Sequence, residues 1–310
     1  MDTSLVMKKQ SVEVLRQFAV VLSCMAVLQA QAAGCMGMQF HAHRGAPDVP
    51  ENSLGSVKAA LAGEWDGAEM DIQRLRDGAW VLHHDLKLGR TTSLQGRSTG
   101  DLDSQAWREV RLKDRQGRVV SERAAFLSDV LGLPGQGKVL NVEIKQLGLD
   151  CQAVAQAAQQ LAQGRPDGQW FLTSIDRRTL ACARRADPRG YLGLIVLDPQ
   201  ALAKENGGRV AQAVAARTTS PVIDRPWMQR LQQEVGGTVG LHVDMATLEA
   251  NPRLLPEAQS MGIPVFTYHL GADREHAQAL ARHAKISGWW PSGVIINGTP
   301  SAFCDVLAKP

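Results

Sequence analysis

The middle of this chain reads VLNVEI (139–144), QAVAQAAQQLAQ (152–163), WFLTS (170–174), RRTLACARR (177–185) and YLGLIV (191–196). The first, third and fifth runs are short and apolar, which is typical of buried strands. The second and fourth runs are longer and rich in Ala, Leu or Arg, which favours helices. Strands that alternate with helices in this way indicate right-handed βαβ units with a parallel sheet.

The same alternation continues outward from this stretch in both directions. We expect five further strands, at 38–43, 67–72, 240–243, 264–268 and 293–296, and further helices at 53–62, 201–216, 249–261 and 274–285. Eight such units in about 260 residues predict an α/β fold, a TIM-like (β/α)8 barrel. A doubly wound open sheet is the alternative, and residues 221–225 could add a ninth strand.

One segment, residues 80–123, breaks the alternation. It begins with a short apolar run and continues as a Gly-, Ser- and Arg-rich stretch. We therefore expect a small excursion from the barrel after strand two, inside one domain that spans residues 35–310.

Residues 1–34 have the order of a signal peptide. Three basic residues, Lys8, Lys9 and Arg16, precede an apolar run at 18–28, and small residues follow it. A run of about 11 apolar residues is too short for a membrane span. We expect a periplasmic or secreted protein. A lipid anchor at Cys35, after a loose lipobox at 32–35, is the less favoured outcome, and an ordinary N-terminal helix is the alternative to a signal peptide.

The composition is that of a soluble globular protein: 310 residues, 44% hydrophobic and 21% charged. Thirty-four basic and 31 acidic residues leave a formal charge of +3, so we expect no nucleic-acid partner. Five cysteines are present. An oxidising compartment permits disulfides, and Cys151 and Cys182 lie on successive expected helices. A bond between them and a pair of free thiols are equally compatible with the sequence.

Polar residues cluster where expected strands end, which in a barrel is the active-site end. The clusters are HAHRG (41–45), EMD (69–71), HHD (83–85) and NVEIK (141–145). Buried acids need a positive partner, and Glu69, Asp71 and Glu143 together form an oxygen-rich site suited to Mg²⁺ or Ca²⁺. The alternative is a structural ion network with Arg44 and Lys145.

Two histidines lie among these residues, His43 and His84. Imidazole titrates near neutrality, so the pair is a candidate general acid and base. Arg44 and Lys145 are cations able to hold a phosphate. A metal, two imidazoles and two cations predict metal-assisted phosphodiester cleavage. We expect the six other histidines to be structural: His41, His83, His242, His269, His276 and His283.

At these positions the sequence resembles the glycerophosphodiester phosphodiesterase family. The matching motifs are HRG (43–45), PENS (50–53), EMD (69–71), DG (77–78), VLHHD (81–85), LGRTT (88–92) and VEIK (142–145). The resemblance implies a TIM-like barrel in which Glu69, Asp71 and Glu143 hold a divalent cation. It further implies that His43 and His84 form the acid–base pair, that Arg44 and Lys145 contact phosphate, and that Glu51 and Asn52 support the site.

The resemblance also implies the reaction and its substrate class. The hydroxyl next to the phosphorylated glycerol carbon attacks phosphorus, and water opens the resulting cyclic phosphate to glycerol 3-phosphate. The expected partner is a small glycerophosphodiester such as glycerophosphocholine. Lysophospholipase-D-like cleavage, with Trp289 and Trp290 as an apolar lip, and a non-catalytic phosphodiester-binding protein are the alternatives.

The chain departs from the family pattern near its end. YHLG (268–271) replaces the usual Trp-Thr-Val-Asn, and Tyr268 is expected to present its ring to the substrate. Asn297 and Gly298 stand where the family usually has Thr-Asp. These changes affect the expected substrate preference more than the expected catalysis.

Overall fold

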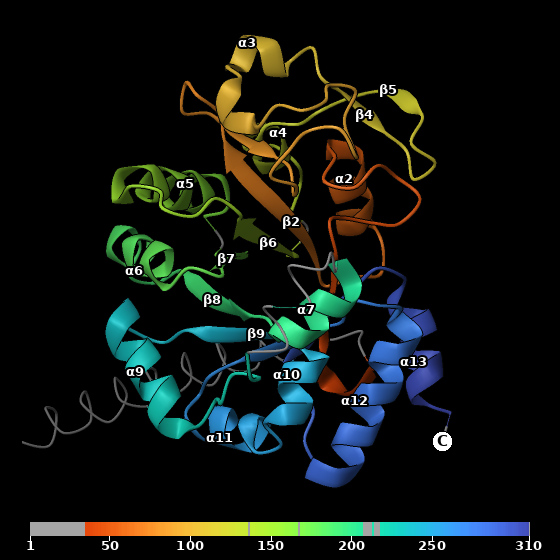
Figure 1. The fold of residues 1–310 in the computed structure, drawn as a ribbon, viewed down its shortest axis with the longest axis vertical. Helices are drawn as coiled ribbons and strands as arrows, with labels where there is room; N and C mark the ends of the chain where they lie inside the picture. The colour runs from red at the N-terminus through yellow and green to blue at the C-terminus, as the bar shows by residue number, and fades with distance from the viewer. Residues whose placement is uncertain (1–34, 136, 167, 207–212, 214–217, 310) are drawn as a thin grey trace, which may run out of the picture.

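The computed structural model describes residues 35–135, 137–166, 168–206, 213 and 218–309. Within them, eight parallel strands close into a barrel (Figure 1). In chain order these are β1 (Gln39–Ala42), β2 (Gly67–Arg74), β6 (Val139–Ile144), β7 (Trp170–Ser174), β8 (Tyr191–Val196), β9 (Gly240–Asp244), β10 (Val265–Tyr268) and β11 (Gly293–Ile296). Because β1 pairs with both β11 and β2, the sheet has no open edge there. The predicted barrel is confirmed, and the open sheet is excluded.

Helices surround the barrel in Figure 1. They are α2 (Leu54–Ala62), α5 (Cys151–Gly164), α6 (Arg177–Ala186), α7 (Pro199–Asn206), α9 (Arg225–Val235), α10 (Met245–Ala250), α11 (Leu254–Ser260), α12 (Asp273–Ser287) and α13 (Pro300–Leu307). Side chains cap several of them at the N-terminus, such as Asp150 on α5 and Asp176 on α6. Such a cap satisfies backbone N–H groups that have no partner inside the helix. A short 3-10 turn, η1 (Cys35–Gly37), precedes β1.

Two expected elements differ from the structure, and one lies partly outside it. The helix expected at 249–261 is two helices, because Pro252 disfavours helical backbone at Asn251. The possible ninth strand at 221–225 is wrong. Its backbone bonds to the side chain of Asn251 instead, at 2.7 Å from the Ile223 N–H, and Arg225 begins α9. Much of the second half of the helix expected at 201–216 falls outside the described residues.

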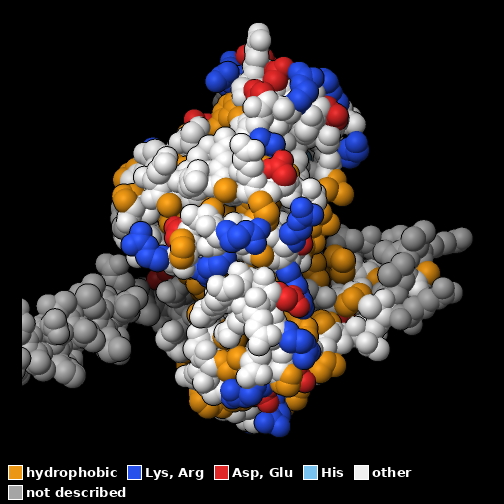
Figure 2. All heavy atoms as spheres, turned by 90° about the vertical axis from the view of Figure 1, so that its left-hand side faces the viewer, with side chains coloured by type: hydrophobic (Ala, Val, Ile, Leu, Met, Phe, Trp, Pro, Cys, Tyr) orange, Lys and Arg blue, Asp and Glu red, His pale blue; other side chains and the backbone are white. Residues whose placement is uncertain are grey.

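The excursion follows β2 directly. It contains β3 (Trp80–Leu82), which pairs antiparallel with β2, then η2 (Thr99–Asp101), α3 (Ser104–Trp107), β4 (Arg111–Lys113) and β5 (Val119–Arg123). α4 (Leu127–Leu131) leads back to the barrel. The excursion has its own apolar core, made by Leu75, Val81, Leu88, Leu102, Trp107, Val110, Leu112 and Ala124. In Figure 2 it forms the upper end of the molecule, where basic and acidic side chains alternate.

The barrel interior is closed by a layer of rings. The His41 ring contacts those of Phe171 and Phe266, with centroids 5.4 and 4.9 Å apart. A Cβ atom at Gly67 would lie 2.8 Å from the His41 ring, so only glycine allows this packing. A functional pocket inside the barrel must therefore lie above this layer, at the carboxyl ends of the strands.

Disulfides join Cys151 to Cys182 and Cys35 to Cys304. The first connects α5 with α6, so the structure favours the bonded form of this pair over free thiols. The second, which the sequence analysis did not foresee, ties the start of the described chain to α13. A sulfur in a disulfide cannot also form a thioether, so the Cys35 sulfur is not free to hold a lipid in this structure.

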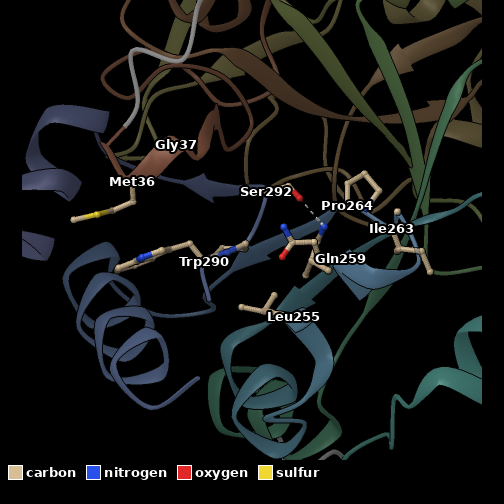
Figure 3. Close-up of a pocket in the computed structure, with 11 residues that line it drawn as sticks. Met36, Gly37, Leu255, Gln259, Ile263, Pro264, Trp290 and Ser292 are labelled. Atoms are coloured by element: carbon tan, nitrogen blue, oxygen red, sulfur yellow. Dashed lines mark hydrogen bonds between the residues drawn. The ribbon is translucent and has the colours of Figure 1, made fainter. Parts of the chain in front are cut away.

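Trp289 and Trp290 lie at the wrong end of the barrel to form a lip around the site. They precede β11, and the amino ends of parallel strands lie opposite the active-site end. Trp290 lines a hollow of about 380 Å³ with Met36, Leu255, Gln259, Ile263 and Ser292 (Figure 3). The apolar lip considered as an alternative is therefore wrong. Among the described residues, no helix is long and apolar enough to cross a membrane.

Buried histidines predict a specific acid sensitivity. Burial lowers the pKa of His41, His242 and His276 to about 3. The unfolded chain binds protons at these rings below pH 6.5 and the folded chain does not until about pH 3. The free energy of unfolding should thus fall with decreasing pH across this window, by up to ~1.4 kcal/mol per pH unit for each histidine.

Urea unfolding at several pH values between 7 and 4 measures this slope. His242→Gln removes one titrating ring and should make the slope less steep than in the unsubstituted protein. An unchanged slope would show that His242 does not titrate differently in the two states.

Candidate active site

Three carboxylates lie close together near the carboxyl ends of the barrel strands. Glu69 and Asp71 lie on β2, and Glu143 lies opposite Asp71 in the register with β6. One oxygen atom of each lies within 4.8 Å of the others, and all three residues are buried. Residues two apart on a strand share a face, so the strand pairing places all three acids around one point.

The charge at this point is not balanced by the protein. Burial raises the pKa of Glu69 well above its usual value, and Asp71 and Glu143 add to the shift. Burial also raises the pKa of Glu143, against the effect of Lys145. For Asp71 burial acts in the same direction, but Lys145, His84, Arg44 and Asn52 outweigh it and lower the pKa to about 2. A cluster with this excess of negative charge and only oxygen donors could hold a hard divalent cation.

The two neighbouring cations pair with only part of the cluster. Lys145 Nζ lies 2.9 Å from Glu143 and 3.7 Å from Asp71. Arg44 Nε lies 3.5 Å from Asp71. Glu69 accepts a 2.8 Å hydrogen bond from the Arg44 backbone N–H and forms no ion pair within the described residues. Asp71 and Glu143 are thus ion-paired, whereas Glu69 has no ion-pair partner among the described residues.

The loop between β1 and α2 has an unusual backbone conformation and contacts the acidic cluster. Arg44 and Asn52 have φ of 58° and 52°, in the left-handed region that non-glycine residues seldom adopt. Asn52 exchanges two 2.8 Å hydrogen bonds with Asp71, one through its amide N–H₂ and one through its carbonyl oxygen. The loop thus fixes the orientation of Asp71 through Asn52. Strained backbone of this kind is frequent at functional sites.

His43 follows β1 and is held by a residue that the sequence analysis did not select. Its Nδ1 donates a 2.7 Å hydrogen bond to the side-chain oxygen of Asn297, which directly follows β11. Burial lowers the pKa of His43 to about 4, and the charge of Arg44 acts in the same direction. With Nδ1 protonated, Nε2 of the neutral ring is the free base. Asn297 is one of the late departures from the family pattern, and the closing of the barrel brings it beside His43.

His84 is held by a carboxylate instead. Its Nδ1 lies 2.8 Å from Asp85 Oδ1. Burial would raise the pKa of Asp85, but hydrogen bonds from His84 and Arg90 lower it below the usual range. Arg90 binds Glu51 as well, and Glu51 binds Arg44 at 3.0 Å. Asp85 and Arg90 both lie within the quoted family motifs. The contacts of Asp85 with His84 and Arg90 are local in sequence, whereas Arg90 and Glu51 are 39 residues apart.

Tyr268 lies at the site, whereas His83 is packed in the core of the excursion. Tyr268, at the end of β10, donates a 3.1 Å hydrogen bond to the Val196 carbonyl. Burial raises its pKa, and Asp244 and Glu143 add to this effect, so it lies at the same end of the barrel as the acids. His83 is turned away from the site, against Trp107.

Comparisons with known proteins identify the family of this chain. The family model described as "Glycerophosphoryl diester phosphodiesterase family" matches residues 43–295. A glycerophosphodiester phosphodiesterase of Bacillus altitudinis is 24% identical over 229 residues, 66% of this chain and 92% of the relative. One of Caldanaerobacter subterraneus is 35% identical over 107 residues, 34% of this chain and 44% of the relative.

Solved structures show the same fold. An Oleispira antarctica phosphodiesterase in complex with sn-glycerol-3-phosphate has a TM-score of 0.66 and 20% identity, covering 87% of this chain and 97% of that one. A putative glycerophosphoryl diester phosphodiesterase of Silicibacter pomeroyi has a TM-score of 0.64 and 20% identity, covering 87% and 92%. With the family model matching most of its length, the chain belongs to the glycerophosphoryl diester phosphodiesterase family of phosphoric diester hydrolases.

Proposed function

We propose that this enzyme hydrolyses small glycerophosphodiesters such as glycerophosphocholine to glycerol 3-phosphate and an alcohol. The observation that carries the proposal is the three-carboxylate cluster with two cations beside it and two histidines, each fixed through Nδ1. The glycerol 3-phosphate in the Oleispira antarctica structure supports the product.

Glu69, Asp71 and Glu143 would hold Mg²⁺ or Ca²⁺, and their excess of negative charge fits either ion. A bound divalent cation would polarise a phosphoryl oxygen as a Lewis acid. Arg44 and Lys145 would bind the other phosphate oxygens. Arg44 supports this role because its guanidinium group lies beside the acidic cluster, 3.5 Å from Asp71, with part of the side chain exposed. Tyr268 would place its ring against the glycerol carbons.

The contacts of the two histidines favour different roles. His43 is neutral, with Nε2 free, and would take the proton of the glycerol hydroxyl as this oxygen attacks phosphorus. His84, with the Asp85 carboxylate to stabilise its charged ring, would give a proton to the alcohol oxygen as the phosphorus–oxygen bond breaks. Water would then open the cyclic phosphate with the roles reversed, which restores both rings.

The alternatives lose support in this structure. The apolar lip that favoured lysophospholipids lies at the opposite end of the barrel. A non-catalytic binding protein would need no pair of histidines held in defined orientations, so hydrolysis explains the site better.

The decisive experiment incubates the protein with glycerophosphocholine and measures glycerol 3-phosphate release with and without EDTA. Release that EDTA abolishes and Mg²⁺ or Ca²⁺ restores would support the reaction and its metal. Choline released from lysophosphatidylcholine alone, with lysophosphatidic acid as the second product, would replace the proposed substrate class. Release from neither substrate, with both metals supplied, would favour a binding protein.

Glu69→Gln should weaken the cation site while leaving the fold intact. Loss of one charged ligand should raise the metal concentration for half-maximal activity by at least ~10-fold, equivalent to about 1.4 kcal/mol of binding. Metal titration of activity measures this shift, and calorimetric titration of Mg²⁺ or Ca²⁺ gives a readout that does not need turnover. An unchanged midpoint in both would make Glu69 structural.

Substitution of the histidines should separate acid from base. His43→Ala and His84→Ala should each slow hydrolysis of glycerophosphocholine by roughly 10²- to 10⁴-fold. A 4-nitrophenyl ester of glycerol 3-phosphate has a leaving group that needs no proton. The single-turnover rate of 4-nitrophenol release reports the first step alone, so His84→Ala should recover much of this rate and His43→Ala should not. The opposite pattern would exchange the two roles.

We further propose that the leader directs the chain to the periplasm or outside the cell, without a lipid. Lys8, Lys9 and Arg16 before the apolar run support export, and the two disulfides suit an oxidising compartment. Intact mass and thiol titration of the exported protein test this. We expect an unlipidated chain with no reactive thiol before reduction. A lipid on Cys35, which would leave Cys304 as a free thiol, would contradict the proposal.

A further inference from the structure

Arg90 joins two acids that belong to different parts of the site. Its Nε and Nη2 lie 2.7 and 2.9 Å from the two carboxylate oxygens of Asp85. Its Nη1 and Nη2 lie 2.9 and 2.7 Å from those of Glu51. One guanidinium group thus binds two carboxylates bidentately, a geometry that is both strong and directional.

Each of these acids orients a residue of the proposed chemistry. Asp85 accepts the hydrogen bond from His84 Nδ1, and Glu51 accepts one from Arg44 Nη1. Burial would raise the pKa of Glu51, but hydrogen bonding to Arg90 and the charge of Arg44 lower it, so Glu51 is ionised. Arg90 is therefore one contact away from the proposed acid and one contact away from the proposed phosphate-binding arginine.

The excursion holds Arg90 firmly in this position. The preceding Leu88 is buried in the apolar core of the excursion, and its backbone exchanges hydrogen bonds with Gly96 and Arg97. Gly89 has φ of 137°, and its carbonyl accepts a 2.6 Å hydrogen bond from Lys113 Nζ. After Arg90, the Thr91 carbonyl accepts a 2.8 Å hydrogen bond from the Lys113 backbone N–H. The chain is thus held to the excursion both before and after Arg90, although the Arg90 side chain is half-exposed.

We propose that Arg90 is a positioning residue, through which the excursion aligns His84 from its own segment with Arg44 of the barrel. This inference rests on the proposed function. Without Arg90, Asp85 and Glu51 would be two ionised carboxylates with no shared cation. Their repulsion would separate the segments that they orient.

Besides Asp85, the charged or titratable groups near His84 are Asp71, Glu143 and His83.

The test compares Arg90→Met and Arg90→Lys with a matched control, Arg118→Met. Arg118 lies in the same excursion and pairs with Asp114 at 2.7 Å, and its side chain bonds, among the described residues, only to Asp114 and Gln116. Arg90→Met should lower kcat by about 10- to 100-fold, the usual effect of removing a residue that orients a site group. Arg90→Lys should recover only part, because an ammonium cannot bind two carboxylates bidentately. Arg118→Met should keep its activity.

A double substitution separates positioning from general destabilisation. If Arg90 acts through Asp85, Arg90→Met combined with Asp85→Asn should be far less impaired than the product of the two single losses. Equal losses in Arg90→Met and Arg118→Met, matched by equal falls in thermal midpoint, would overturn the proposal. So would an Arg90→Met rate within twofold of the unsubstituted enzyme.

A measurement without turnover keeps this inference apart from the proposed function. Imidazole ¹⁵N spectra at pH 7 report which ring nitrogen of each histidine is protonated. Arg90→Met should change the His84 signals and leave those of the buried His242 unaltered, whether or not any substrate is hydrolysed. Unaltered His84 signals would refute the positioning role even in an active enzyme. Absent turnover with altered signals would refute only the proposed substrate.

Discussion

The pairing of β2 with β6 places the negative charges of Glu69, Asp71 and Glu143 around one point. Burial makes this arrangement unfavourable unless positive charge is supplied, and the site is organised around that need. Lys145 and Arg44 supply part of it. The negative charge that these two residues do not neutralise could be neutralised by a bound divalent cation. Three acids that are unfavourable by themselves would then form a cation site.

A second consequence of the barrel is that the two histidines are oriented by unlike partners. Asn297, a neutral side chain from the last strand end, holds His43. Asp85, a carboxylate from the excursion, holds His84. Chemically identical rings thus face different electrostatic surroundings, which is the basis of the different roles proposed for them. The excursion is in this view a part of the site, because it supplies His84, Asp85 and Arg90.

Several features were predictable from local sequence. Alternating apolar strands and helices indicated the barrel, and the strands at 139–144, 170–174, 191–196 and 293–296 match the structure to the residue. The spacing of two between Glu69 and Asp71 predicted that both face the same point. Other features were not predictable, since Asn297 lies 254 residues from His43 and Arg90 lies 39 residues from Glu51. The Trp289–Trp290 lip was misplaced although chain order alone excludes it, because residues that precede a strand of a parallel barrel lie at the end opposite the active site.

The sequence by itself determined the fold class, the acidic and histidine residues at the strand ends and the family resemblance. Each depends on periodicity or on short motifs, which are properties of neighbouring residues. Only the tertiary structure decided the partners: which acid remains uncompensated, which group orients each histidine and which cysteines bond. Closing the barrel joins β1 to β11 and brings Cys35 beside Cys304 and His43 beside Asn297. Contacts across a closed sheet depend on register and strand direction, and no local pattern encodes them.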